Sequence, residues 1–312
     1  MIPLLDVEPM PRRLDGWSGL DIEPEDARSI LRPQKDERYG FGFSLNPYRG
    51  CSHACRYCYV REYPHPLRGG EGALRPAESW GSWVAPKLNA PALLWAQRHR
   101  LHEETVFLAS STDPYMPLEK EFRLTRRCLE VLRDCPTTRV LLHTRSPLVL
   151  QDLDLLQSFG PRLTVGFSIS TDDDVIRQVT EPKAPTIPSR WAAMARLAKA
   201  GVNVSLSAAP LLPIRDIGAF AGRARDSGAR AGWAGRLRLL QNDPFHQLLA
   251  EHGWLWILDA DYSAKVNEAL AAALPKPPSR KGKALSGRAA VAPPMRLPEA
   301  QHLALFEPEA SS

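Results

Sequence analysis

Three cysteines close together in the sequence, Cys51, Cys55 and Cys58, form the pattern with the clearest chemical meaning in this chain. Their C-x3-C-x2-C spacing lets one short loop supply three thiolates to a cubic [4Fe–4S] cluster, for which thiolates are the usual ligands. A cluster that only carries electrons is normally held by four cysteines. The spacing therefore predicts a cluster whose fourth iron has no protein ligand and is open to a small molecule.

The same cysteines permit a second interpretation, because together with His53 or His65 they could surround a tetrahedral zinc ion. That set would belong to a zinc-bound nucleic-acid-binding module. Common zinc sites, however, combine two ligand pairs separated by a longer loop. No second C-x2-C or H-x3-H pair follows this segment, so the spacing favours the iron–sulfur cluster and leaves zinc as the alternative.

Stretches typical of strands and of helices alternate along the chain, and they must position the cysteine loop, defined here as residues 51–58. Such alternation is typical of parallel strands joined by crossover helices, so we expect an α/β fold. Six βα units are too few to close an eight-stranded barrel. The expected strands are 41–45, 105–109, 139–143, 163–168, 202–206 and 236–240, and the expected helices are 90–101, 124–132, 150–158, 190–200, 216–226 and 244–252.

The composition is that of a soluble globular protein, with 44% hydrophobic and 24% charged residues in 312. No run of about 18 apolar residues occurs, so no membrane span is expected. The first residues lack the charged and apolar regions of a signal peptide. Five cysteines, three of them within eight positions, favour a reducing cytoplasm over a disulfide framework.

Composition divides the chain into three parts. Residues 1–38 are rich in Pro, Asp and Arg and are expected to form an irregular extension, whereas 39–274 carry the alternating elements. Residues 275–312 are proline-rich and basic, which predicts a flexible tail. The net charge is +5, and residues 276–312 contribute six basic and three acidic residues to it. This mild excess permits contact with nucleic acid, but solvated surface lysines and arginines explain it equally well.

Polar and charged side chains recur where the expected strands end. Residues 110–113 (Ser-Ser-Thr-Asp) follow the second strand, Arg145 follows the third, and Ser168 ends the fourth. Glu181, in a Glu-Pro pair, and Arg190 come later. Together with the cysteine loop, this ordered set resembles the radical S-adenosylmethionine (SAM) superfamily, and within it the spore photoproduct lyase branch of DNA repair proteins, over residues 46–213. The resemblance implies an open (β/α)6 partial TIM-type barrel, with its active site at the carboxyl ends of the strands.

The resemblance also implies the chemistry of the site. The three cysteines would hold the [4Fe–4S] cluster, and SAM would bind its open iron. Reductive cleavage of SAM would then give methionine and a 5′-deoxyadenosyl radical that abstracts a hydrogen atom from a substrate. An electron donor such as a flavodoxin or a ferredoxin would be needed. The side chains expected to contact SAM are Tyr57, Ser110, Ser111, Asp113, Arg145 and Ser168.

Structural roles for the same side chains stay open. Packing of the ring against its neighbours explains Tyr57 as well as a contact with SAM does. Ser, Thr and Asp are favoured in turns and helix caps whether or not they bind a ligand. Arg145 stands where the branch has a lysine that touches the SAM carboxylate, and the replacement keeps the charge but changes the donor geometry. Glu181 is expected either to contact SAM or to brace Arg190 as a buried ion pair.

Ser110 is the most informative departure from that branch, in which a cysteine at this point donates the hydrogen atom that quenches the substrate radical. The O–H bond of serine is too strong for that task, so the sequence argues against spore photoproduct repair by the known route. Cys128 and Cys135 lie seven residues apart near one helix. Because free cysteines usually behave as small hydrophobes, we expect both to pack in the core.

The tail contains a short peptide, Gln301 to Phe306, that resembles the motif by which bacterial DNA polymerases and repair factors bind the DNA sliding clamp. Its expected anchors are Gln301, Leu303, Leu305 and Phe306. An extended arm that presents apolar anchors to a groove is a common recognition mode, although the stretch could equally pack on its own domain. Together with the basic tail it favours a lesion or modified base in DNA or RNA as substrate, with a protein or small metabolite as the alternative.

Overall fold

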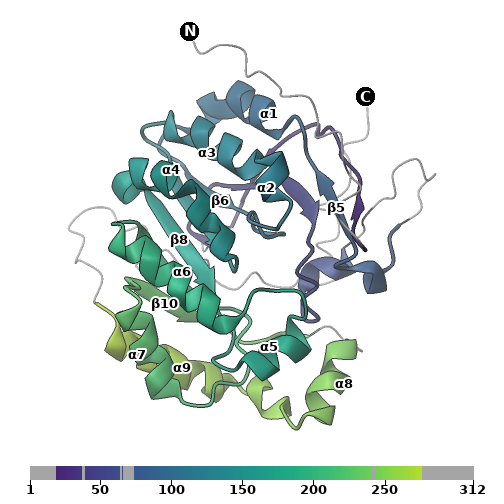
Figure 1. Cartoon of the computed structure of the whole chain (residues 1–312), viewed down its shortest axis with the longest axis vertical. Coiled ribbons are helices and arrows are strands. Elements are labelled where there is room, and N and C mark those ends of the chain that lie inside the picture. The colour runs from purple at the N-terminus through teal and green to yellow at the C-terminus, as the bar shows by residue number, and fades with distance from the viewer. Residues whose placement is uncertain (1–18, 37–38, 64, 66–73, 240–242, 276–312) are drawn as a thin grey trace.

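Seven strands form the main sheet of the computed structural model, which describes residues 19–36, 39–63, 65, 74–239 and 243–275 (Figure 1). Their order is β10-β9-β8-β7-β6-β3-β2. Every neighbouring pair from β10 to β3 is parallel, and only the pair of β2 with β3 is antiparallel. The strands are β2 (Leu31–Pro33), β3 (Phe43–Leu45), β6 (Thr105–Leu108), β7 (Arg139–Thr144), β8 (Leu163–Ser168), β9 (Asn203–Ala208) and β10 (Ala231–Ala234). Six parallel strands with helices outside them confirm the predicted α/β partial barrel.

The sixth predicted strand, 236–240, is wrong in position. The strand that pairs with β9 is β10, which ends at Ala234, and residues 236–239 belong to no helix or strand. The alternation of Arg236, Leu237, Arg238 and Leu239 is typical of a half-exposed strand. The chain instead enters the sheet earlier because Gly228, in the left-handed conformation, ends the preceding helix three residues before β10.

Helices connect successive strands, and polar side chains cap several of them. Asp173, Thr186 and Asp216 each accept a hydrogen bond from a backbone N–H in the first turn of α5, α6 and α7. Asp243 and Asp259 do the same for α8 and α9. The helices are α1 (Ala90–Gln97), α2 (Glu119–Phe122), α3 (Leu124–Arg133), α4 (Leu153–Ser158), α5 (Asp174–Thr180), α6 (Ile187–Lys199), α7 (Ile217–Asp226), α8 (Pro244–Glu251) and α9 (Ala260–Ala273). The predicted helices are all present, whereas α2, α5 and α9 were not predicted.

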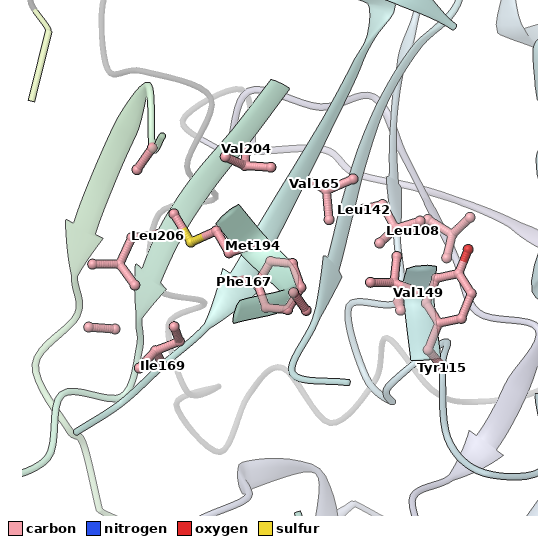
Figure 2. Packing of buried hydrophobic residues seen from close by; sticks show 14 of the residues in the cluster. Leu108, Tyr115, Leu142, Val149, Val165, Phe167, Ile169, Met194, Val204 and Leu206 are labelled. Carbon is pink, nitrogen blue, oxygen red and sulfur yellow. The ribbon is translucent and has the colours of Figure 1, made fainter. Parts of the chain in front are cut away.

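The main core lies between the sheet and these helices, on what we call the outer face of the sheet (Figure 2). Val165 and Phe167 of β8 and Val204 and Leu206 of β9 are fully buried there, against Met194 of α6. Burying each such side chain stabilises the fold by about 1.5–3 kcal/mol. Because side chains alternate along a strand, the residues between them point to the opposite side, which we call the inner face.

A second, three-stranded sheet carries the start of the cysteine loop. Its order is β1-β5-β4, formed by Asp21–Ile22, Trp83–Pro86 and Tyr48–Gly50. The N-terminal extension, expected to be irregular, thus contributes β1 and β2 from its described part. The predicted tail 275–312 and its clamp-like peptide lie outside the described residues, apart from Pro275. Within the described ranges, no helix combines the length and the hydropathy that a bilayer crossing requires.

Candidate functional site

The cysteine loop follows β4 directly and holds three thiols that are buried or partly buried. Cys51 and Cys55 are buried, and Cys58 is partly exposed. Burial raises the pKa of each thiol to about 12, and each thiol further raises the pKa of another through its charge. The three sulfur atoms are therefore close enough to interact, and they stay protonated until a metal displaces the protons.

The backbone of the loop is held in conformations that few residues adopt. Gly50 has φ +78°, and a Cβ there would stand 2.6 Å from the carbonyl oxygen of Trp83, so only glycine fits. Ala54 (φ 55°), inside the loop, and Ala109 (φ 70°), after β6, are both in the left-handed region. Strained residues of this kind cluster at functional sites, where the surroundings impose the strain.

Hydrogen bonds tie the cysteine loop to the segment that follows β6. Thr112 Oγ1 donates to the Gly50 carbonyl at 2.7 Å, and Tyr59 Oη donates to the Ser110 carbonyl at 2.9 Å. The backbone N–H of Arg56 donates to the Thr180 carbonyl at 2.9 Å, at the end of α5. The loop therefore lies over the carboxyl ends of the parallel strands, where α/β folds bind their ligands.

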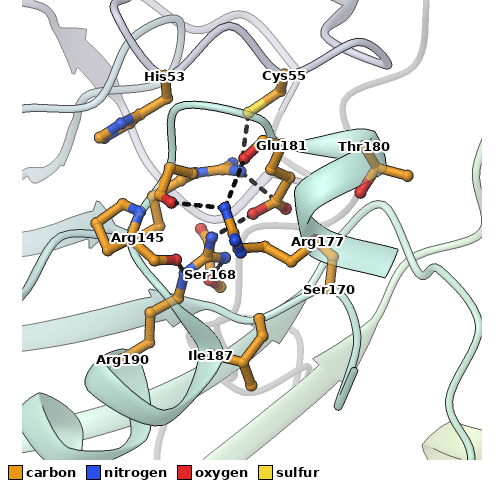
Figure 3. Close-up of polar contacts among 12 residues, drawn as sticks. His53, Cys55, Arg145, Ser168, Ser170, Arg177, Thr180, Glu181, Ile187 and Arg190 are labelled. Atoms are coloured by element: carbon orange, nitrogen blue, oxygen red, sulfur yellow. Dashed lines mark hydrogen bonds and ion pairs between the residues drawn. The ribbon is translucent and has the colours of Figure 1, made fainter. Parts of the chain in front are cut away.

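Arg145, directly after β7, reaches from the sheet to this loop (Figure 3). Its Nη1 lies 3.0 Å from Cys55 Sγ and 3.0 Å from Tyr57 Oη. The same nitrogen lies 3.0 Å from Glu181 Oε1. Arg145 thus connects a candidate cluster ligand to a buried carboxylate, and its predicted contact with the SAM carboxylate stays a prediction.

Glu181 is fully buried between two arginines. Its Oε2 accepts a short hydrogen bond from Arg190 Nη2, while its Oε1 faces Arg145 and accepts from Tyr57 Oη. Burial alone would raise the pKa of Glu181, but the positive charges of Arg190 and Arg145 lower it to about 2. Arg190 also donates to the Ser168 carbonyl at 3.1 Å. The bracing role that the sequence left open for Glu181 is confirmed.

Tyr57 combines the two roles considered for it. Its ring is 8% exposed and packs edge-on against Phe245, with ring centroids 5.8 Å apart. Its hydroxyl joins the Arg145 and Glu181 contacts and lies 3.3 Å from Ser170 Oγ. The packing role is confirmed, and the contact with SAM remains a prediction.

Asp113 joins the ends of two strands to the cysteine loop. Its Oδ1 accepts from Tyr115 N at 2.9 Å and from Thr144 Oγ1 at 2.7 Å. Its Oδ2 accepts from Arg145 N at 2.8 Å and lies 3.4 Å from His53 Nε2. Burial opposes ionisation, but the nearby His53 and these hydrogen bonds lower the pKa of Asp113 to about 2. The turn role is confirmed, and few lone pairs are left for an ammonium group.

The three predicted serines differ in whether their hydroxyl groups already make hydrogen bonds within the protein. Ser110 Oγ accepts from Asn46 Nδ2 at 3.0 Å, and Asn46 Oδ1 accepts from Ser111 N at 3.0 Å. The hydroxyls of Ser111 and Ser168 make no hydrogen bond to any described residue, and both residues are partly exposed. Of the predicted SAM contacts, Ser111 and Ser168 therefore have the freest hydroxyls.

Two supporting residues were not singled out in the sequence. Asn46 binds both Ser110 and Ser111, and Thr144 donates to Asp113. Each stands one position beyond a predicted strand, at the edge where α/β proteins place their ligands. Position after a strand end was therefore the signal that could have found them.

A zinc ion would need His53 or His65 beside the three cysteines, and His65 is already engaged. His65 Nε2 bonds the Val60 carbonyl at 2.8 Å, and its ring packs against Trp80 and Trp83. Nowhere in the described part of the chain are three His, Cys, Asp or Glu side chains grouped to hold a single ion. Cys51, Cys55 and Cys58 supply three thiols from one loop, and thiolates are the usual donors to a cluster. Neither ring nitrogen of His53 makes a hydrogen bond within the described residues.

The remaining cysteines lie elsewhere. Cys128, on α3, is fully buried in the main core, and Cys135 packs partly buried against that core. Burial raises the pKa of both thiols. The predicted core packing of these two residues is confirmed.

Replacing Asp113 by asparagine is expected to destabilise the protein at pH 7 by about 1.5–3 kcal/mol, the range for hydrogen bonds to a charged group. The folded pKa of about 2 lies below the ordinary value of 3.8. The carboxylate's contribution is therefore complete above about pH 4 and is lost as the pH falls through 2. Urea unfolding of both proteins at pH 7 and pH 3 checks this, and equal differences at the two pH values would contradict it.

Known proteins resemble this chain over the region that contains the candidate site. A model of the radical SAM superfamily matches residues 45–221. The uncharacterized protein MJ0683 of Methanocaldococcus jannaschii is 30% identical over 196 residues, covering 63% of this chain and 70% of that protein. The uncharacterized protein Rv2578c of Mycobacterium tuberculosis is 31% identical over 180 residues, covering 55% of this chain and 50% of that one. The chain thus spans only about half of this second relative.

Solved structures of spore photoproduct lyase share the fold. A cysteine-to-serine mutant matches with a TM-score of 0.50 and 17% identity, over 66% of this chain and 57% of that one. A tyrosine-to-phenylalanine mutant matches with a TM-score of 0.60 and 14% identity, over 81% of this chain and 78% of that one. At these identities the likeness is one of fold.

Proposed function

This chain belongs to the radical SAM superfamily, and from that premise we propose that Cys51, Cys55 and Cys58 hold a [4Fe–4S] cluster with which it cleaves SAM. The observation that carries the proposal is the placement of three interacting thiols, two of them buried and one partly exposed, over the carboxyl ends of six parallel strands. When bound, the cluster supplies the electron that breaks the C5′–S bond of SAM and so starts hydrogen-atom abstraction from a substrate. The protein contributes by excluding solvent from the site and by positioning the reacting groups.

The side chains around the loop have separable tasks in this proposal. Arg145 holds a positive charge beside Cys55 Sγ, where it favours the thiolate that metal binding requires. The hydroxyls of Ser111 and Ser168, which no described residue engages, accept from or donate to the polar groups of SAM. Tyr57 orients Arg145 through its hydroxyl. The buried ion pair of Glu181 and Arg190 holds Arg145 and Tyr57 in position.

Anaerobic reconstitution with iron and sulfide tests the proposal. We expect close to four irons and four sulfides per chain, a paramagnetic centre after reduction that SAM perturbs, and formation of 5′-deoxyadenosine without added substrate. Purified protein that contains zinc, lacks sulfide and cleaves no SAM would support the zinc-bound nucleic-acid module instead.

For the substrate, we propose a lesion or modified base in nucleic acid. Three observations support it: the mild positive charge, the fold shared with spore photoproduct lyase, and the clamp-like peptide at Gln301, Leu303, Leu305 and Phe306. One of the matching structures of that lyase contains a dinucleoside spore photoproduct. Ser110 cannot donate a hydrogen atom as a cysteine would, so a reaction other than spore photoproduct repair is proposed. A cytoplasmic location and a flavodoxin or ferredoxin as electron donor complete the proposal, and a protein or small metabolite is the alternative substrate.

Removing residues 275–312 separates these substrate classes. We expect the shortened protein to cleave SAM at a rate within about two-fold of the full chain, because every proposed ligand lies before residue 275. Binding to the DNA sliding clamp should be lost, and binding to DNA should weaken and depend less steeply on salt, because six basic residues are removed. Surface plasmon resonance on both partners measures this. Unchanged binding to both would favour a protein or small-metabolite substrate.

A further inference from the structure

Where β8 and β9 form it, the inner face of the sheet is lined by small and polar side chains. In closed (β/α)8 barrels this face is filled by bulky branched residues. Here β8 presents Gly166 and Ser168, and β9 presents Ser205 and Ser207, because their neighbours Val165, Phe167, Val204 and Leu206 face the outer core (Figure 2). Strand pairing places Gly166 beside Ser205 and Ser168 beside Ser207. The result is a continuous wall of small residues.

Two polar atoms on this wall are buried and have no hydrogen-bond partner among the described residues. Ser205 is 1% exposed, and its Oγ makes no hydrogen bond to any described residue. Trp233 Nε1, on β10, is buried and unpaired in the same way. Trp233 lies opposite Ser207 in the strand register, so both unpaired atoms belong to residues of the inner face. Buried donors nearly always have partners, and an exception requires an explanation.

His143 forms the other side of the wall. A Cβ at Gly166 would stand 2.5 Å from His143 Nε2, so the imidazole lies over this glycine on the inner face. The ring also packs edge-on against Phe107, with centroids 4.8 Å apart. Burial lowers the pKa of His143 to about 4. The imidazole is therefore neutral at pH 7 and offers one donor and one acceptor.

The chemistry of the wall restricts what can bind to it. Where β8, β9 and β10 form this face, their described residues bring no Asp, Glu, Lys or Arg to it, whereas Arg139 lies on β7 and Arg32 on the far strand β2. A charged ligand group would be buried there without a counter-charge, which is costly. The indole N–H only donates, so the ligand must present an acceptor to Trp233. The rings of Trp233 and His143, on opposite sides of the wall, favour a flat ligand. Stacking of a base on an aromatic side chain contributes about 1–3 kcal/mol.

We infer that this inner wall binds a neutral, planar ring bearing carbonyl acceptors, as a nucleobase does, and that Ser205 and Trp233 are its hydrogen-bonding partners. The inference rests on the proposed function and names the part of the substrate that the protein recognises. Trp233 and Ser205 are substrate-positioning residues in this assignment. His143 supplies the opposite edge of the wall.

Binding to the reconstituted, unreduced protein in the presence of SAM tests the inference, because no turnover occurs without an electron. The probes are dinucleotides of uridine and of thymidine, with an N-acetyl dipeptide amide as the peptide counterpart, titrated by isothermal calorimetry. Trp233→Phe keeps the ring and removes the N–H, and Ser205→Ala removes the hydroxyl. Each is expected to raise the Kd for a dinucleotide about five- to ten-fold, the effect of one lost hydrogen bond.

Trp191→Phe is the matched control. Trp191 Nε1 is also buried and unpaired within the described residues, but it lies on α6 in the outer core. This change should leave dinucleotide binding within about two-fold of the wild type. An equal loss in Trp191→Phe would show a general packing effect and overturn the inference.

Three other results would also overturn it. These are the absence of dinucleotide binding to the wild type, a preference for the peptide amide, and a rise in the Kd for SAM in Trp233→Phe, which would assign the wall to SAM. In each case, 5′-deoxyadenosine formation by the wild type would still support the proposed function. Absence of that product would count against the function itself.

Discussion

Replacement of Cys55 by alanine is expected to remove the brown iron–sulfur chromophore and to lower 5′-deoxyadenosine formation to below about one hundredth of the wild-type rate. Loss of a residue outside the ligand shell of a metal site already costs about 10- to 100-fold, and Cys55 would be a ligand itself. Its sulfur also receives the hydrogen bond from Arg145. The absorption spectrum after anaerobic reconstitution and a chromatographic assay of the product measure both effects.

Cys135→Ala is the matched control for this prediction. Cys135 is a partly buried cysteine that packs against the outer core and lies far from the loop in sequence. Its replacement should leave iron content and product formation within about two-fold of the wild type. If Cys55→Ala were to form the product at the wild-type rate, the assignment of the cluster to this loop would be wrong.

Replacement of Glu181 by glutamine is expected to destabilise the fold by about 3–5 kcal/mol, the cost of breaking a buried ion pair by removing one partner. Arg190 is fully buried and would keep its charge without a counter-charge. Arg145 would lose the same partner and with it part of its orientation toward Cys55. Urea unfolding followed by circular dichroism measures the change in the free energy of unfolding.

The pH dependence gives this prediction a second test. Because the pKa of Glu181 is about 2 in the folded protein, below its ordinary value of 4.5, its charge stabilises the fold fully above about pH 5. That contribution is lost as the pH falls through 2. Wild type and variant should therefore differ less at pH 3.5 than at pH 7.

Glu130→Gln provides the comparison at the surface. Glu130 pairs with Arg126 one helical turn away, and its side chain is 37% exposed. Exposed pairs of this kind contribute only about 0.3–0.5 kcal/mol. A loss of stability in Glu181→Gln as small as that in Glu130→Gln would mean that the buried network does not hold the site together.

Arg145 is the residue for which the structure adds most to the sequence. The resemblance to the spore photoproduct lyase branch implied a contact with the SAM carboxylate, which stays a prediction. The fold surrounds its guanidinium with a thiol, a phenol and a carboxylate, from Cys55, Tyr57 and Glu181. Local pattern identified the position, but the partners come from segments 36 to 90 residues away in the chain.

The sequence by itself determined what depends on local spacing and on periodic patterns. The three cysteines lie within eight positions, so their common loop was evident from their spacing. Five of the six parallel strands coincide closely with the predicted ones, because each carries apolar residues at least at every second position. The sixth was misplaced because Ala231–Ala234 is short and contains a glycine, which is a weak strand signal.

Only the tertiary structure decided which distant groups meet. The brace of Glu181 between Arg145 and Arg190, the four contacts of Asp113 and the inner wall of Gly166, Ser205 and Trp233 all depend on strand register. A shift of one residue in any strand would turn its side chains to the other face. Local patterns in the chain do not specify that register, because it is set by the packing of the outer core.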